Sequence, residues 1–164
     1  MLRLYAFFHL NIMFSSIEEA QRPEVIKRCY WPVLRLAEKL NRPIGVEATG
    51  YTLETIEKLD PEWLGACRAL IERGLIEPIG SGYAQMIGPL MPAELVRWNL
   101  KLGHKTYDRL WGRRPRLALI NEQAYLSSVF SSVTCLSTMI RIVIGIWVGV
   151  FIGVMDSPAL NCPR

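Results

Sequence analysis

Histidine and paired cysteine are scarce in this sequence. Its 164 residues include two histidines, His9 and His104. The four cysteines contain no Cys-x-x-Cys pair and lie far apart, at Cys29, Cys67, Cys135 and Cys162. Zinc sites and disulfide frameworks need closely spaced ligands or paired cysteines, which this spacing does not offer. We therefore expect no metal, no cofactor and a reducing, cytoplasmic setting.

Charged residues are nearly absent from the last part of the chain. Residues 1–125 contain 17 Lys or Arg and 14 Asp or Glu, whereas residues 126–164 contain only Arg141, Asp156 and Arg164. In the first part the two signs alternate, and basic residues are not interleaved with aromatic ones as a single-stranded nucleic-acid surface requires. The net charge of +4 therefore does not predict a nucleic-acid partner.

The tail over residues 126–164 also lacks a run long enough to cross a bilayer unaided. Residues 142–155 form an uncharged run of 14, short of the roughly 18–20 needed, and extending it back to residue 135 would bury Arg141. Its glycines repeat every four residues, as in packed membrane helices. Three interpretations stay open: a membrane anchor through residues 135–155, a buried element, or sequence foreign to the domain, as a frameshift would produce. The abrupt loss of charge favours the third.

Residues 1–125 alternate between strand-like and helix-like segments. Short apolar runs predict strands near residues 5–10, 44–50, 75–83 and 116–121. Helical spacing of apolar residues follows each of the first three runs. This alternation is typical of an α/β fold with a parallel sheet of about four strands.

The helices carry recognisable start and stop signals. We expect a kink at Pro32 within residues 24–40, an N-cap at Thr52, and a second N-cap at Asp60 for a helix that Gly74 ends. A further helix begins at Pro92. Four apolar residues are expected on one side of it: Leu95, Trp98, Leu102 and Tyr107.

Polar side chains end each expected strand. The carboxyl ends of parallel strands meet at one face of a barrel or sheet, so these residues predict a catalytic cleft. Glu122, which ends an apolar run, is the first candidate for chemistry. The strand-end residues are His9 and Asn11, Glu47 and Thr49, Ser81 and Tyr83, and Asn121 and Glu122.

Each candidate also has a plain structural alternative. His9 fits a partly buried histidine bonded to a backbone carbonyl, and Glu47 and Glu77 fit ion pairs with nearby arginines. Glu122 would be stabilising as the cap of a following helix. Glu77 lies early in its strand, so it reaches the cleft only if its parity points it inward.

Three short motifs, in order and at strand positions, resemble glycoside hydrolase family 57 over residues of about 4–125. His9-Leu10-Asn11 matches the family's His-Gln-Pro, of which only His9 is kept. Gly74-Leu75-Ile76-Glu77-Pro78-Ile79 matches Gly-Gln-Leu-Glu-Ile-Val, with Pro78 as a departure. Leu119-Ile120-Asn121-Glu122 matches Trp-Leu-x-Glu, the strand end that carries the nucleophile, with Leu119 in place of tryptophan.

The resemblance implies the N-terminal half of a (β/α)7-type catalytic barrel that acts on α-glucans by a retaining mechanism. Glu122 would be the nucleophile, and the expected ligand is an oligo- or polysaccharide. His9 and Glu77 would bind the sugar, with Asn11, Glu47 and Tyr83 as further candidate substrate-binding residues.

The family's acid/base is an aspartate from a later strand. After residue 125 this sequence offers only Asp156, which lies in no matching motif. We therefore expect a truncated domain that does not hydrolyse glucans by itself. Two other functions stay open: a membrane-attached carbohydrate-binding or interaction protein, and a polysaccharide deacetylase relative. The absence of clustered Asp and His ligands disfavours the last.

Overall fold

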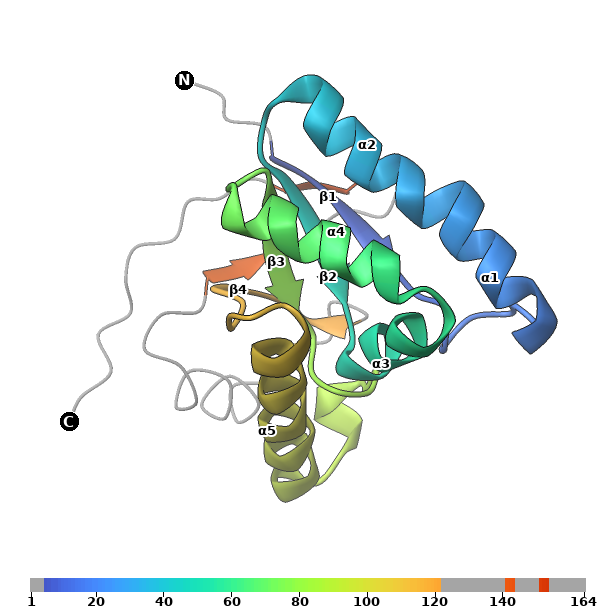
Figure 1. Ribbon diagram of the computed structural model, residues 1–164. Helices are drawn as coiled ribbons and strands as arrows, with labels where there is room; N and C mark the ends of the chain where they lie inside the picture. Colours follow the sequence, from blue (N-terminus) through green and yellow to red (C-terminus); the bar gives the residue numbers. More distant parts are fainter. Residues whose placement is uncertain (1–4, 122–140, 144–150, 154–164) are drawn as a thin grey trace.

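The computed structural model describes residues 5–121, 141–143 and 151–153. These residues form one sheet of six strands in the order β5-β4-β3-β2-β1-β6 (Figure 1). Neighbouring strands from β1 to β5 are parallel, and β6 is antiparallel to β1. The predicted α/β fold with a parallel sheet is confirmed. The strands are β1 (Tyr5–Leu10), β2 (Ile44–Ala48), β3 (Ile76–Gly80), β4 (Leu117–Leu119), β5 (Arg141–Val143) and β6 (Phe151–Gly153).

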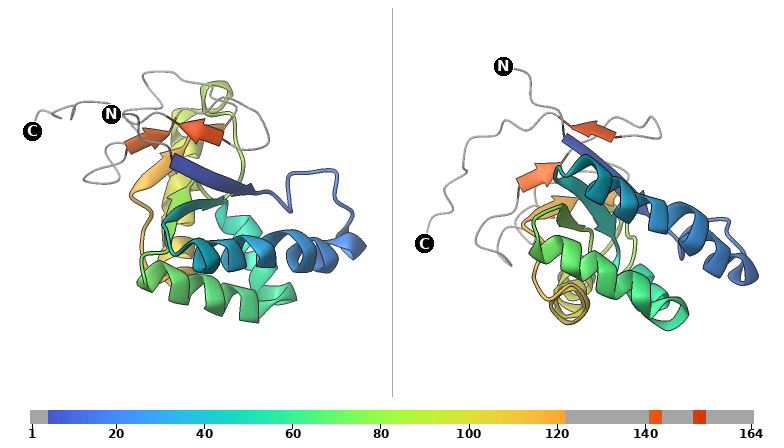
Figure 2. Two further views of the ribbon diagram at one scale, coloured as in Figure 1. Left: turned by 90° about the horizontal axis from the view of Figure 1, so that it is seen from above. Right: turned by 45° about the horizontal axis from the view of Figure 1, so that its top comes forward.

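Helices connect β1 to β2, β2 to β3, and β3 to β4. Figure 2 shows the continuous segment from α1 to α2 side by side with α4 along one face of the sheet. A right-handed crossover between parallel strands places its helix against the sheet in this way. The helical elements are η1 (Glu19–Gln21), α1 (Arg22–Val25), η2 (Ile26–Tyr30), α2 (Trp31–Leu40), α3 (Gly50–Leu59), α4 (Pro61–Glu72), η3 (Gly88–Leu90) and α5 (Ala93–Leu110).

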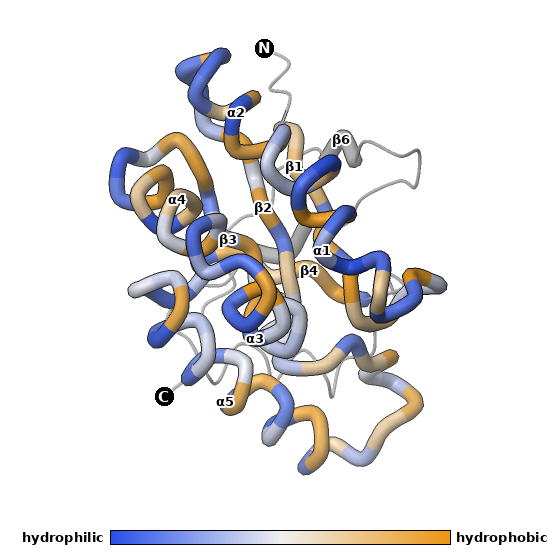
Figure 3. Tube along the Cα trace, turned by 45° about the vertical axis from the view of Figure 1, so that its right-hand side comes forward, coloured by the Kyte–Doolittle hydropathy of each residue, from blue (hydrophilic) through white to orange (hydrophobic). Residues whose placement is uncertain are grey.

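The two faces of the sheet bury different sets of side chains. Leu10, Val46 and Ile76 pack with the helices in the main hydrophobic core. On the other face, Phe7 and Ile79 form a small cluster with Leu117 and Leu119. Successive side chains of a strand point to opposite faces, so residues two apart from this cluster share its face. Figure 3 shows apolar residues along the strands and polar residues on the outer sides of the helices.

The segment over residues 24–40 differs from the predicted helix with a kink at Pro32. It contains a π-helical turn, η2, between α1 and α2, and Pro32 lies in the first turn of α2. The chain stays helical from η2 into α2, and the Trp31 N–H bonds to the Ile26 carbonyl five residues back, so the wider π-helical spacing occurs before Pro32. The irregularity therefore precedes the proline.

Two helix caps were predicted, and one of them is shifted. Thr49, not Thr52, caps α3, since the Thr49 hydroxyl accepts a hydrogen bond from the Thr52 N–H at 3.1 Å. Asp60 caps α4 as predicted, accepting from the Trp63 N–H at 3.0 Å. Gly74 follows the end of α4 with a φ of 73°, a conformation that favours glycine.

The apolar residues of α5 do not share one side as predicted. Leu95, Trp98 and Leu102 are 46%, 59% and 45% exposed, whereas Tyr107 is 1% exposed. At 100° per residue, Tyr107 falls on the opposite stripe from Leu102. The buried stripe of α5 consists of Val96, Gly103, Thr106, Tyr107 and Leu110.

Two short pieces of the tail are described, and both are strands at the edges of the sheet. β5 pairs with β4, and β6 pairs with β1. Within the described ranges, no helix is long and apolar enough to cross a membrane. The remainder of residues 126–164, including most of the segment 135–155, lies outside the described residues.

Candidate active site

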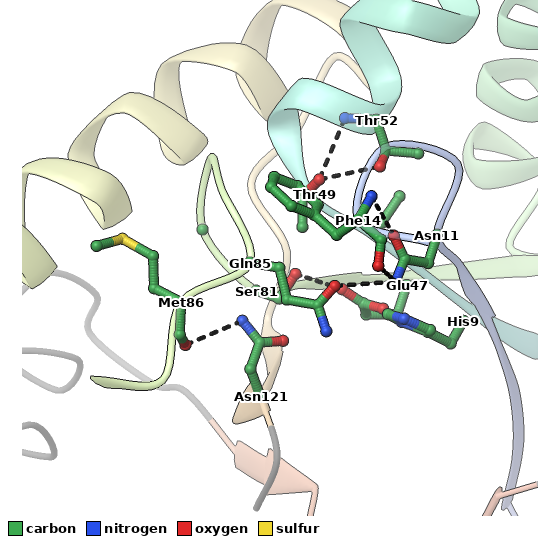
Figure 4. Close-up of polar contacts among 12 residues, drawn as sticks. His9, Asn11, Phe14, Glu47, Thr49, Thr52, Ser81, Gln85, Met86 and Asn121 are labelled. Atoms are coloured by element: carbon green, nitrogen blue, oxygen red, sulfur yellow. Dashed lines mark hydrogen bonds and ion pairs between the residues drawn. The ribbon is translucent and has the colours of Figure 1, made fainter. Parts of the chain in front are cut away.

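Glu47 is the centre of a buried polar cluster at the carboxyl ends of three strands. It is fully buried and lies opposite His9 in the register of β1 and β2. The Ser81 hydroxyl, just beyond β3, donates to Glu47 Oε1, and His9 Nδ1 bonds to Glu47 Oε2 (Figure 4). The partners of Glu47 are thus a histidine and a serine, not the arginine of the ion-pair alternative.

Tyr107 connects this cluster to α5. Its hydroxyl accepts a hydrogen bond from the Ser81 N–H at 3.1 Å and lies 2.9 Å from the carbonyl oxygen of Ala48 and 2.8 Å from that of Gly82. Burial raises the pKa of Tyr107, so its hydroxyl keeps the proton that it donates to these carbonyls. One side chain thereby fixes the ends of β2 and β3 relative to each other.

The loop after β3 is held close against α5. The Tyr83 N–H donates to the Asn99 carbonyl at 3.1 Å, and the Asn99 side chain bonds to both backbone groups of Ala84. A Cβ on Gly103 would lie 2.6 Å from the carbonyl carbon of Gly82. The glycine therefore permits the close approach that sets the position of the loop.

Asn11, a predicted substrate-binding residue, lies in the turn after β1. Its Oδ1 accepts from the Phe14 N–H at 2.9 Å, and its Nδ2 donates to Gln85 Oε1 at 2.9 Å. The first bond closes an Asx turn. The second bond joins the loop after β1 to the loop after β3, so Asn11 links two rims of the site.

Tyr83 belongs to an aromatic group at the same edge of the sheet. Its ring stacks on Tyr51 with centroids 5.8 Å apart, and Phe14 meets Tyr51 edge to face at 6.2 Å. The Tyr83 hydroxyl donates to Glu54 at 2.9 Å. Burial and this hydrogen bond raise the pKa of Tyr83, which keeps the phenol protonated. Phe14 and Tyr51 are 39% and 38% exposed, so part of this aromatic surface faces solvent.

Glu77 lies nearer the amino ends of the strands than the other candidates do. It pairs with Gly45 near the start of β3, two residues before Ile79, which pairs with Glu47. Its side chain points to the same face of the sheet as Ile79, which is the orientation that the sequence interpretation required. Its position along β3 is therefore two residues from the level of Glu47 and His9, on the amino-terminal side.

Asn121 is the last described residue before the predicted nucleophile. It is buried, and its Nδ2 donates to the Met86 carbonyl at 3.3 Å. This bond ties the end of the β4 segment to the loop that Asn11 also contacts. Glu122 itself lies outside the described residues.

Two residues of the site carry no sequence signal that would have found them. Tyr107 reads as an apolar helix residue, and its hydroxyl partners come from segments 25 and 59 residues away. Gln85 occurs in a loop without a motif. Only the folded chain shows that Tyr107 contacts the ends of β2 and β3 and that Gln85 bonds to Asn11 after β1.

Comparison with known proteins adds the family to this geometry. The family model described as Glycosyl hydrolase family 57 matches residues 5–137, most of the chain and twelve residues beyond the expected boundary at 125. The chain belongs to glycosyl hydrolase family 57. The motif resemblance of its first part is thereby confirmed.

Curated relatives match over parts of the chain. An "Alpha-amylase" of Pyrococcus furiosus is 28% identical over 72 residues, which cover 43% of this chain and 11% of that protein. "Alpha-amylase 1" of Dictyoglomus thermophilum is 31% identical over 84 residues, which cover 51% of this chain and 12% of that protein. The aligned parts thus span about a tenth of the length of these relatives.

Solved structures show the same fold. A 4-alpha-glucanotransferase from Thermococcus litoralis superposes with a TM-score of 0.72 at 21% identity, over 85% of this chain and 22% of that protein. A family 4 carbohydrate esterase from Streptomyces lividans superposes with a TM-score of 0.59 at 10% identity, over 87% of this chain and 62% of that protein. The described residues contain no group of three or more His, Cys, Asp or Glu side chains placed to hold a metal ion.

Proposed function

We propose that this chain supplies the first strands and the nucleophile of a catalytic site that acts on α-glucans with retention of configuration. Membership of glycosyl hydrolase family 57 is the observation that carries the proposal. The named activities of the similar proteins, α-amylase and 4-α-glucanotransferase, support an α-glucan as the substrate class.

Glu122 is the proposed nucleophile. It follows Asn121 directly in the sequence, and Asn121 is bonded to the Met86 carbonyl in the loop after β3. In a retaining reaction the carboxylate attacks the anomeric carbon, while a carboxylic acid about 5–5.5 Å away protonates the leaving oxygen. His9 and Glu77 are the proposed sugar-binding residues, with His9 at the carboxyl edge of the sheet and Glu77 deeper on the same face, and Tyr83 contributes an aromatic rim.

An activated donor tests the nucleophile without the second carboxylate. With a 5-fluoro-α-glucosyl fluoride, Glu122 forms a bond to C1 as fluoride leaves with the electron pair of the C–F bond, so no acid is required. We expect mass spectrometry of the 164-residue chain to find one adduct on the peptide that contains Glu122. Because the chain lacks an assigned acid/base, we also expect no turnover of ordinary maltooligosaccharides.

Two variants control this experiment. Glu122→Gln should abolish the adduct, whereas Glu62→Gln, at an exposed position in the first turn of α4, should label as the parent chain does. Absence of an adduct, or an adduct on another residue, would reject the nucleophile assignment.

A further inference from the structure

We propose that Glu47 is a positioning residue, which fixes the orientation and the protonated nitrogen of His9, and is not itself a sugar ligand. The effect of Glu47 on sugar binding rests on the proposed function, whereas its effect on the His9 ring does not. The contacts that carry it are all present in the chain without a sugar.

Both carboxylate oxygens of Glu47 are already used. Oε1 accepts the Ser81 hydroxyl, and Oε2 faces His9 Nδ1. The Glu47 side chain is 0% exposed, whereas that of His9 is 26% exposed. A sugar at this edge of the sheet can therefore reach the histidine, but it cannot reach the carboxylate without displacing one of these partners.

The pairing also determines where the proton of His9 resides. An ionised carboxylate only accepts hydrogen bonds, so His9 must carry a proton on Nδ1 to bond with it. In the neutral ring this makes Nε2 the unprotonated nitrogen. Glu47 thus selects the tautomer of His9 as well as the angle of its ring, which is the usual task of a carboxylate paired with a functional histidine.

Glu47 is itself held in place from the far side. Ser81 donates to it through the hydroxyl, while the Ser81 N–H donates to Tyr107 at 3.1 Å. Tyr107 is buried and stacks on Trp111 with centroids 5.0 Å apart. The orientation of His9 is therefore fixed through a continuous series of contacts that runs from α5 across three strand ends.

Nitrogen-15 NMR of the imidazole rings in the 164-residue chain tests this assignment directly. The chain has two histidines, so the spectrum of a His104→Gln variant assigns the His9 signals. We expect neutral His9 in the parent chain to be protonated on Nδ1. Protonation on Nε2 in the parent chain would overturn the proposal, and this measurement needs no change at the site.

Two variants at the site separate Glu47 from its neighbour. Glu47→Leu removes the acceptor at similar volume, a replacement that buried ionic groups often tolerate, and should release His9 from the Nδ1-protonated form. Ser81→Ala keeps the carboxylate and should leave the His9 tautomer as in the parent chain. An unchanged His9 spectrum in folded Glu47→Leu would reject the positioning role.

Sugar binding provides a second readout. We expect His9→Ala and Glu47→Leu each to weaken maltotriose binding about tenfold, and the double variant to lose no more than either alone, since both act through one ring. Additive losses would mean that Glu47 contacts the sugar itself, against the proposal. If the tautomer result holds and the parent chain binds no maltotriose, the proposed function fails while the positioning role stands.

Discussion

Tyr107 contacts three backbone groups through one hydroxyl, although it lies on a helix far from the strands in sequence. Its ring is 1% exposed, and its partners come from Ala48, Ser81 and Gly82. Ser81 in turn bonds to Glu47, so the loss of the Tyr107 oxygen would remove the partner of the buried Ser81 N–H next to the Glu47–His9 pair. A buried donor or acceptor without a hydrogen-bond partner lowers the stability of the folded chain.

We expect Tyr107→Phe to lower the free energy of unfolding by about 1–3 kcal/mol, because the ring still packs but its hydrogen bonds are lost. Urea denaturation followed by circular dichroism measures the change. Tyr51→Phe, at a side chain that is 38% exposed, is the matched control and should change the stability by less than about 0.5 kcal/mol. Equal effects of the two substitutions would contradict this account.

His104 should make the stability depend on pH. Burial, with Arg114 as a second cause, lowers its pKa below the ordinary 6.5. Between pH 6.5 and the lowered value the unfolded chain binds more protons, so this contribution is complete above pH 6.5 and is lost as the pH falls. Urea denaturation at a series of pH values should show that the free energy of unfolding falls less below pH 6.5 in His104→Gln than in the parent chain. The same dependence on pH in both chains would contradict the assignment to His104.

The helix starts show how local signals survive in the fold. Thr49 and Asp60 each accept a hydrogen bond from the backbone N–H three residues later. Asp60 also accepts from the Trp31 indole at 2.8 Å, so one carboxylate caps α4 and ties it to α2. A cap of this kind belongs to the element, whereas the contact with Trp31 belongs to the packing of two elements.

Removing the Asp60 carboxylate should therefore cost more than a cap alone. We expect Asp60→Ala to lower the free energy of unfolding by at least about 1 kcal/mol, the usual cost of losing an N-cap. Asp60→Asn keeps an acceptor for the Trp63 N–H and should recover most of the loss in the same urea series. If the Asn variant is as unstable as the Ala variant, the cap is not the source of the effect.

The edges of the sheet determine how the molecule behaves as a whole. Unpaired strand edges template association with other chains, and very short edge strands limit it. Here β5 and β6, three residues each, lie outside β4 and β1. A half-barrel made only of residues 1–125 would leave β1 and β4 as edge strands. The tail supplies a neighbouring strand to each of them.

We expect a chain that ends at residue 137, where the family match ends, to self-associate because β1 and β4 become edges. Size-exclusion chromatography with light scattering detects the change. A chain that ends at residue 153 keeps both edge strands and should behave as the full chain does. Identical profiles for all three chains would show that β5 and β6 do not protect the sheet.

Much of the fold could be predicted from the sequence, since the apolar run of the first strand, the N-cap at Asp60 and the helix end at Gly74 are local features. Apolar runs of strand length and turn residues act within a few positions of the chain. The family motif around His9 and Glu122 is local for the same reason. The face of α5 was not predicted correctly, because Leu95 and Trp98 are apolar whether or not a partner covers them.

The sequence by itself determined the alternation of strands and helices, the family, and which residue types end each strand, because these depend on spacing along the chain. Only the tertiary structure decided that Glu47 pairs with His9 and Ser81, that Tyr107 bonds to the Ser81 backbone, and that Asn11 links two loops. Those contacts join residues 26 to 74 positions apart. The register of parallel strands and the close approach of α5 bring them together, and neither is encoded by any single segment.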